Sequence, residues 1–119
     1  MGGGTGGGFK GTKGSSINIS DKNMHQIGKH FNKHGRDMGY SSKAEYNNAA
    51  REFVNSYQNH PDAKIYEGKW NGGGIYNNRI QRIVTYDNKT AIINPNTGQI
   101  IDFYTGTDRK GIIGLKRIR

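Results

Sequence analysis

The stretch SKAEYNNAAREFVNSY, from Ser42 to Tyr57, decides the fold. Ser42 followed three residues later by Glu45 is a capping box, which marks the start of a helix. Because no charged group interrupts its apolar face, the stretch predicts an amphipathic helix that packs on the core. The residues at helical spacing are Tyr46, Ala49, Ala50, Phe53, Val54 and Tyr57.

Another helix is predicted ahead of this one, from about Asp21 to His34. Ser20 is a good N-cap for it, and Gly35 supplies the stop. The apolar residues at helical spacing are Met24, Ile27 and Phe31.

The pattern changes after Pro61 to short β-like runs separated by turn signals. The runs cover residues 63–70, 79–86, 90–94 and 99–105. Short links between them favour an antiparallel meander. The predicted fold class is therefore α+β, with two N-terminal helices packed on an antiparallel meander of about four strands. Residues 111–119 either add a strand or form a basic tail.

The chain has 119 residues and a formal net charge of +9, from 18 Lys and Arg against 9 Asp and Glu. This balance indicates one small domain whose partner is a polyanion. Nucleic acid is favoured over an anionic membrane, because no segment has the apolar length of a transmembrane helix. The absence of cysteine excludes disulfides, thiolate zinc sites and cysteine nucleophiles.

Residues 1–16 are rich in glycine and are predicted to form a flexible linker. Residues 17–119 then form a single basic domain. A linker in front of a compact domain suggests the terminal module of a longer polypeptide, although an ordinary disordered tail explains the composition equally well. The sequence shows no export signal of its own, so export would depend on a segment upstream.

Two histidines one helical turn apart, His30 and His34, lie among Lys29, Lys33 and Arg36. Imidazole can both give and take a proton near neutral pH. Cleavage of RNA without a metal needs a base for the 2′-hydroxyl, an acid for the leaving oxygen and positive charge for the phosphorane. The two histidines and their neighbours therefore predict a catalytic site.

The same spacing also suits two ligands of a metal ion. The chain has no cysteine and acidic residues are sparse around the pair, so we expect no metal and no cofactor. In the simplest alternative, both histidines are ordinary residues at the boundary of a basic helix. The positive neighbours favour a site, because each of them lowers a histidine's pKa and keeps the imidazole available as a base.

Three parts of the sequence resemble a known family: residues 30–40, the helix that follows, and the late hairpin 94–105. They are similar to the C-terminal toxin domains of contact-dependent inhibition and other polymorphic toxins, in the group with the barnase/EndoU/colicin/RelE-like nuclease fold. Within that group they look most similar to the tRNase domain of colicin D.

In that family a lysine-histidine-glycine run carries the general acid or base, which makes His34 the proton-transfer group and Lys33 the cation beside it. The family also places a small hydroxyl residue and then an aromatic residue on the late hairpin. Here Asp102 stands at the hydroxyl position and Tyr104 at the aromatic position, with Thr105 next. Either Thr105 takes the hydroxyl role, or Asp102 orients a histidine.

The resemblance implies a metal-independent endoribonuclease that cuts tRNA in the anticodon region. A ribose 2′-oxygen would attack the adjacent phosphorus and leave a 2′,3′-cyclic phosphate and a 5′-hydroxyl. His34 would be one proton-transfer group, and His30 or a second polar group would be the other. Trp70 fits a half-buried position better than a stacking one. The candidates for phosphate and base contacts are Lys33, Arg36, Lys69, Trp70, Arg79, Arg82 and Tyr104.

A toxin of this family also implies an acidic immunity protein and delivery from the producing cell into the cytoplasm of a target cell. We expect the domain itself to be a monomer. The charge alone also fits a nucleic-acid-binding module without catalysis, and a basic structural or ribosomal-type protein fits less well. The cations that would neutralise phosphates in any register are Arg109, Lys110, Lys116, Arg117 and Arg119.

Overall fold

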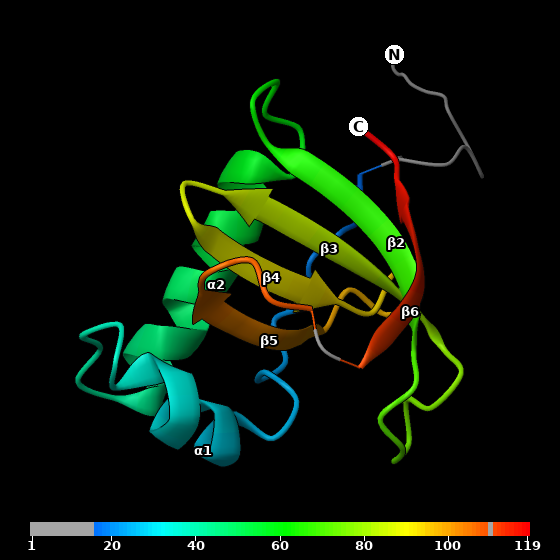
Figure 1. Cartoon of the computed structure of the whole chain (residues 1–119). Coiled ribbons are helices and arrows are strands. Elements are labelled where there is room, and N and C mark those ends of the chain that lie inside the picture. Colours follow the sequence, from blue (N-terminus) through cyan, green and yellow to red (C-terminus); the bar gives the residue numbers. More distant parts are fainter. Residues whose placement is uncertain (1–15, 110) are drawn as a thin grey trace.

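The computed structural model describes residues 16–109 and 111–119. In this part of the chain, five strands form one antiparallel sheet in the order β5-β4-β3-β2-β6. Helical segments cover one face and one edge of this sheet (Figure 1). The predicted α+β class is confirmed, with one strand more than the four expected. The predicted linker, except for Ser16, lies outside the described residues.

The helical segments are α1 (Ile27–His30), the π-helical turn η1 (Phe31–Gly35) and α2 (Lys43–Tyr57). The strands are β2 (Lys64–Trp70), β3 (Ile80–Tyr86), β4 (Lys89–Ile93), β5 (Ile100–Thr105) and β6 (Ile112–Arg117).

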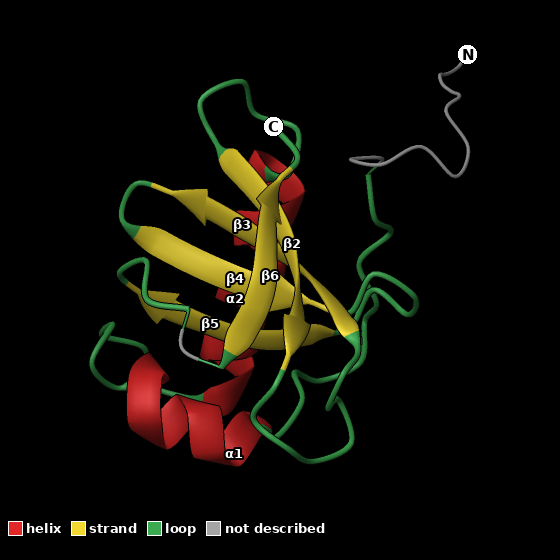
Figure 2. Ribbon diagram, turned by 45° about the vertical axis from the view of Figure 1, so that its right-hand side comes forward, coloured by secondary structure: helices red, strands yellow, loops and turns green. Residues whose placement is uncertain are grey.

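Strands β2 to β5 form the predicted meander, in which each strand pairs with the next. The link between β3 and β4 is a two-residue turn in which Asp87 and Asn88 both have positive φ, 52° and 60°. That conformation matches the twist of paired strands. The last strand, β6, returns to the opposite edge and pairs antiparallel with β2 (Figure 2). Of the two predictions for residues 111–119, the strand is therefore the correct one.

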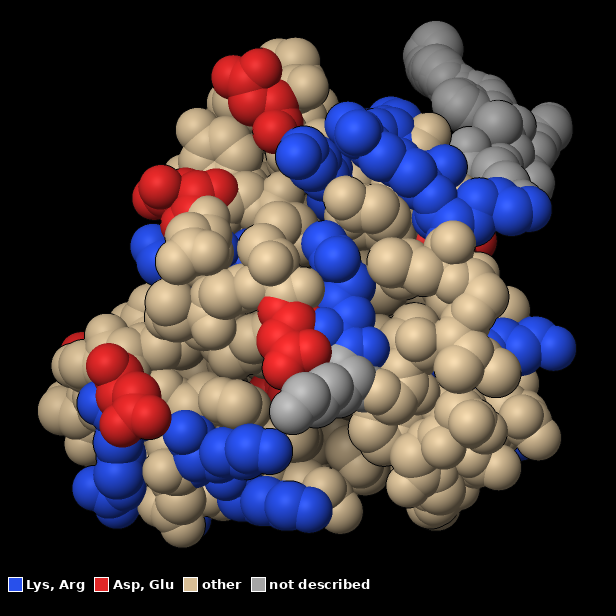
Figure 3. All heavy atoms as spheres, in the orientation of Figure 1, with Lys and Arg blue, Asp and Glu red and all other residues tan. Residues whose placement is uncertain are grey.

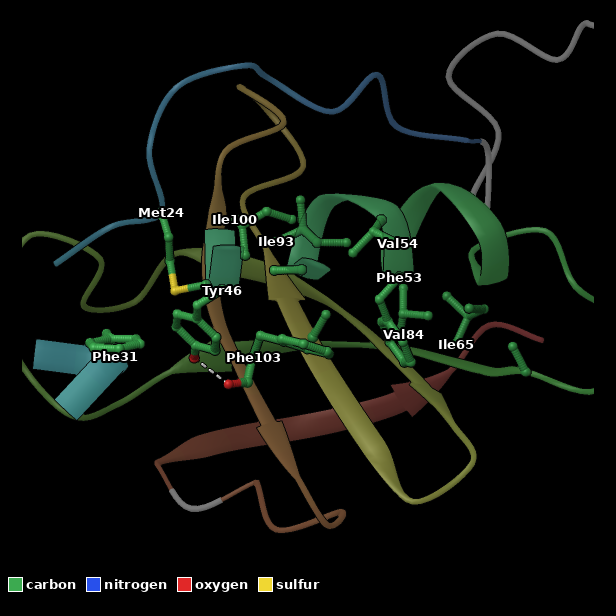
Figure 4. Packing of buried hydrophobic residues seen from close by; sticks show 13 residues of the cluster. Met24, Phe31, Tyr46, Phe53, Val54, Ile65, Val84, Ile93, Ile100 and Phe103 are labelled. Atoms are coloured by element: carbon green, nitrogen blue, oxygen red, sulfur yellow. Dashed lines mark hydrogen bonds between the residues drawn. The ribbon is translucent and has the colours of Figure 1, made fainter. Parts of the chain in front are cut away.

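The helix α2 forms where the capping box predicts it. Ser42 Oγ accepts a hydrogen bond from the Glu45 backbone N–H at 3.1 Å, and the Glu45 carboxylate accepts one from the Ser41 N–H at 2.8 Å. The apolar face of α2 packs on β3, β4 and β5. At the centre of this core the Tyr46 hydroxyl donates a hydrogen bond to the Phe103 carbonyl (Figure 4).

The first helix is shorter than predicted, because it begins at Ile27 and not near Asp21. The Ser20 hydroxyl accepts a hydrogen bond from the N–H two residues on, at 3.0 Å, and closes a local turn instead of capping a helix. The Ser20 N–H also donates to the Gly98 carbonyl at 2.9 Å. This segment is therefore tied to the start of β5 and is not free to join the helix.

The turn after α1 is a π-helix, in which an N–H bonds to the carbonyl five residues earlier. The Arg36 N–H bonds in this way to the Phe31 carbonyl at 3.0 Å. A Cβ on Gly35 would lie 2.6 Å from the Phe31 ring and 3.0 Å from the Tyr46 ring. The glycine thus lets the turn lie directly on α2, and this contact positions the preceding residue, His34.

Apolar side chains are buried on both faces of the sheet. The face under α2 holds the main core, to which the sheet contributes Ile65, Val84, Ala91, Ile93, Ile100 and Phe103. The opposite face holds a smaller cluster made of Ile83, Ile92, Ile101 and Tyr104. Over the described ranges, none of the helices is long and apolar enough to cross a membrane.

Candidate functional site

His30 and His34 meet one carboxylate, that of Asp102 on β5, at the edge of the sheet. His30 Nδ1 lies 3.2 Å from Asp102 Oδ1, and His34 Nε2 lies 3.6 Å from Asp102 Oδ2. The two imidazole rings are nearly parallel, with 6.2 Å between their centroids. The His30 and His34 side chains are 14% and 22% exposed, so the cluster is mostly buried but still open to solvent.

A β-bulge in β5 orients Asp102 toward the histidines. Asp102 pairs with Ile92 of β4, whereas the next residue of β4, Ile93, pairs with Ile100, which leaves Ile101 as an extra residue. Asp102 therefore points to the side of the sheet away from α2. The structure thus brings the two predicted histidines together and adds Asp102 as a third member of the cluster.

Burial sets the protonation of the cluster. It lowers the pKa of His30 to about 4, with further lowering by the neighbouring histidines and lysines. It also lowers the pKa of His34, where Lys33 adds to the effect and Asp37 opposes it. Burial raises the pKa of Asp102 to about 6. At neutral pH the imidazoles are therefore neutral and the carboxylate is ionised.

Tyr104 forms a wall of the cluster. Its ring centroid lies 5.2 Å from that of His34, and its hydroxyl donates a hydrogen bond to the Asp108 carbonyl. Burial raises the pKa of Tyr104, so the phenol stays protonated at neutral pH. Since Tyr104 is only 8% exposed, it has little surface for the predicted base stacking. Its contact with His34 instead restricts the position of the imidazole.

The predicted cations differ in their relation to the cluster. Lys33 is exposed and lowers the pKa of both His34 and Asp102 through its charge. The Arg36 guanidinium lies over the Phe31 ring, 4.9 Å from its centroid, and Nε donates to the neighbouring Asn32 side chain at 3.1 Å. Lys and Arg side chains gather over α1 and the segment that follows it (Figure 3).

Two predicted site residues lie on the other face of the sheet. Arg82 is buried on the α2 side and pairs with Glu67, with 2.7 Å between Nη2 and Oε2. Thr105 points to that same side, because side chains alternate along β5 and the preceding Tyr104 faces away from α2. The structure therefore does not bring Arg82 or Thr105 to the histidines. Of the two roles considered for the late hairpin, it favours Asp102 as the group that orients a histidine.

Three further predicted contacts lie on β2 or beside it, with β3 and β4 between them and β5. The Trp70 indole N–H donates to the Gly73 carbonyl at 2.7 Å, and the half-buried ring is held by its own loop. The Trp70 backbone N–H bonds to the Arg79 carbonyl at 3.1 Å. Lys69 is exposed and, by alternation along β2, lies on the α2 side. None of the three joins the cluster.

Arg109 lies on the same face of the sheet as the cluster, and sequence reasoning did not single it out for the site. Its guanidinium is 4.2 Å from the centroid of the Tyr66 ring, and Nη2 donates to Thr85 Oγ1 at 3.4 Å. Its buried Nε has no hydrogen-bond partner in the described structure. In the sheet, Thr85 of β3 pairs with Thr90 of β4, and Thr90 pairs with Tyr104 of β5. The charge of Arg109 lowers the pKa of Tyr104. Because Arg109 sits in a loop, no periodic pattern distinguishes it from the other cations.

The position of Asp102 bears on the expectation that the histidines bind no metal. Acidic residues are sparse around the histidines in the sequence, but folding brings a carboxylate from β5 to both of them. Donor atoms of His30, His34 and Asp102 all lie within 4.8 Å of one another. The residue set therefore has the composition of a two-histidine, one-carboxylate metal site.

No protein-family model matches the chain, and no curated protein and no solved structure matches it significantly.

Proposed function

We propose that this domain cleaves phosphodiester bonds in RNA with side chains as the acid and base. One observation carries the proposal: a single mostly buried carboxylate bridges two imidazoles that are neutral at pH 7, beside an exposed lysine. Groups whose pKa values are shifted by burial and by each other are typical of catalytic sites. The net charge of +9 favours a polyanionic substrate.

Within this class, we propose a metal-independent endoribonuclease domain of a bacterial polymorphic toxin, with tRNA as its substrate and an acidic immunity protein as its inhibitor. The choice of tRNA, the immunity protein and delivery into a target cell rest on the resemblance of residues 30–40 and 94–105 to that family. Charge supports the partner, because a basic domain associates fast with an acidic protein.

In the proposed reaction His34, the more exposed imidazole, removes the proton from the ribose 2′-hydroxyl. The 2′-oxygen bonds to phosphorus, the bond from phosphorus to the 5′-oxygen breaks, and that oxygen receives a proton. The pair of His30 and Asp102 supplies this proton when the cluster holds one. The products are a 2′,3′-cyclic phosphate and a 5′-hydroxyl. Lys33 and Arg109 stabilise the negative charge on the phosphorane oxygens.

A non-catalytic nucleic-acid-binding module is the second candidate. It is favoured by the cations that lie away from the cluster, of which Lys116 and Arg117 are exposed on β6. Lys and Arg side chains form another group near β2 and β6 (Figure 3). Such a module would bind RNA in a salt-sensitive way and leave it intact.

The deciding experiment incubates the purified chain with tRNA in EDTA and maps the new RNA ends. We expect 5′-hydroxyl ends, and 3′ ends that become extendable only after the cyclic phosphate is removed. His60→Gln is the matched control, because His60 packs on Tyr57 and Tyr86 instead of the cluster. Intact RNA, or cleavage that needs added magnesium and leaves 3′-hydroxyl ends, would overturn the proposal.

A further inference from the structure

His30, His34 and Asp102 bring two nitrogen donors and one carboxylate within 4.8 Å of one another. The two distances between a histidine nitrogen and a carboxylate oxygen are 3.2 Å and 3.6 Å. Zinc ligands about 2.0–2.1 Å from the metal in a tetrahedron lie about 3.4 Å from each other. These two distances match that spacing, and all three donor groups lie within 4.8 Å of one another. Small movements of the side chains would therefore complete the arrangement that a tetrahedral metal needs.

The second observation concerns the His30 Nδ1 atom, which lacks a hydrogen-bond partner. It is buried and has no aligned hydrogen bond with any described residue, although Asp102 Oδ1 is only 3.2 Å away. A buried polar atom without a partner is unusual and costs free energy. If this nitrogen carries a lone pair, it repels the carboxylate unless a cation lies between them. A metal ion at this point would satisfy both atoms.

We propose that His30, His34 and Asp102 bind a divalent transition-metal ion of the zinc type, and that the bound ion inhibits the nuclease. Two imidazoles and one carboxylate suit zinc, whereas magnesium and calcium require oxygen ligands. The bound ion occupies the lone pairs that the proposed reaction uses for proton transfer. The inhibition rests on the proposed function, but the binding of the metal does not.

The charge of the surroundings limits the affinity. Lys33 lies near enough to act on both His34 and Asp102, and a positive charge beside a metal site weakens cation binding. Among the residues that the structure describes, the cluster offers three protein ligands, so the fourth position is open to water. We therefore expect reversible binding that EDTA removes, as distinct from a permanent structural zinc site.

The binding test uses the whole chain, freed of metal with a chelator and then titrated with Zn²⁺ against a coloured zinc indicator. We expect one equivalent to bind, with no competition from Mg²⁺. Bound Co²⁺ should give the visible absorption of a low-symmetry nitrogen–oxygen site. Asp102→Asn and His34→Gln should each lower zinc affinity at least about tenfold, whereas His60→Gln should leave it unchanged.

Two independent readouts separate this inference from the proposed function. The inference is supported if zinc inhibits RNA cleavage in proportion to its binding and EDTA restores the rate. No zinc binding by the wild-type chain, or an equal loss in His60→Gln, overturns the metal site and leaves the nuclease proposal intact. Zinc binding without RNA cleavage under any condition overturns the nuclease and keeps the metal site. Zinc-stimulated cleavage overturns the inhibition. Because two ligand variants are used, misfolding of one leaves the other as the test.

Discussion

Substitutions at Asp102 and His30 should change the pH dependence of stability in opposite directions. Burial raises the pKa of the Asp102 carboxyl from 3.8 to about 6. The folded state then holds this proton more tightly than the unfolded chain, so the group destabilises the fold increasingly as pH rises from about 4 to about 6. A pKa change of about 2 corresponds to about 3 kcal/mol in full.

The contribution of His30 to the pH dependence of stability has the opposite sign. Burial lowers its pKa from 6.5 to about 4, so the unfolded chain gains the proton first as pH falls. His30 therefore destabilises the fold at low pH, and its cost disappears as pH rises through about 6.5, again with a full size of about 3 kcal/mol. In the wild-type chain the two contributions largely cancel between about pH 4.5 and pH 7. Each single substitution removes one side of this balance.

The assay is urea unfolding in EDTA at about pH 4.5 and about pH 7. Relative to wild type, Asp102→Asn should be more stabilising at pH 7 than at pH 4.5 by about 2 kcal/mol, because it removes a buried charge that exists only at the higher pH. His30→Gln should show a difference of about 2 kcal/mol in the opposite direction. Curves that stay parallel to wild type at both pH values would refute the claim that these groups are desolvated in one cluster.

Four further substitutions test other parts of the structure. His34→Ala should reduce RNA cleavage by about a hundredfold to ten-thousandfold, measured in single-turnover assays, with RNA affinity nearly unchanged; full activity would contradict its role in proton transfer. Arg109→Ala should lower the cleavage rate at saturating RNA, whereas Arg117→Ala should weaken binding and flatten its salt dependence; identical profiles would argue against a special place for Arg109. Ser42→Ala should cost about 1 kcal/mol in urea unfolding because α2 loses its cap, and an unchanged midpoint would contradict this. Gly35→Ala should cost about 1–3 kcal/mol and should be visible as a lower melting temperature, because its Cβ would meet the rings packed against the π-turn.

The parts of the fold that follow local rules could be predicted from the sequence. The apolar spacing and the Ser42 cap identified α2, and the turn residues between 63 and 105 identified the meander. Both signals depend only on residues close together in the chain. The predicted start of the first helix was wrong because Ser20 is held by a hydrogen bond to Gly98, in the turn just before β5. Long-range contacts of this kind leave no local pattern.

Only the part of the site that depends on residues close together in the chain could be predicted. His30 and His34 are neighbours in sequence, so their pairing could be read from helical spacing. Asp102 was placed only at a position of uncertain role, because a β-bulge breaks the alternation that would otherwise assign its face. Arg82 was predicted as a phosphate contact, but it pairs with Glu67 on the opposite face. The register of a strand decides on which face of the sheet each side chain lies, and basic residues in a strand do not specify that register.

The strand β6 leaves one edge of the sheet with unpaired backbone groups, since no described strand lies beyond it. Such an edge can template aggregation by pairing with the same edge of another copy. Here Lys116 and Arg117 place positive charge along it, and Gly114 interrupts its regularity with a φ of +62°. Two copies therefore repel each other where they would otherwise join. This repulsion is screened over about 10 Å at 0.1 M salt, so concentrated solutions of the protein should stay clear at low ionic strength and turn turbid as salt is added.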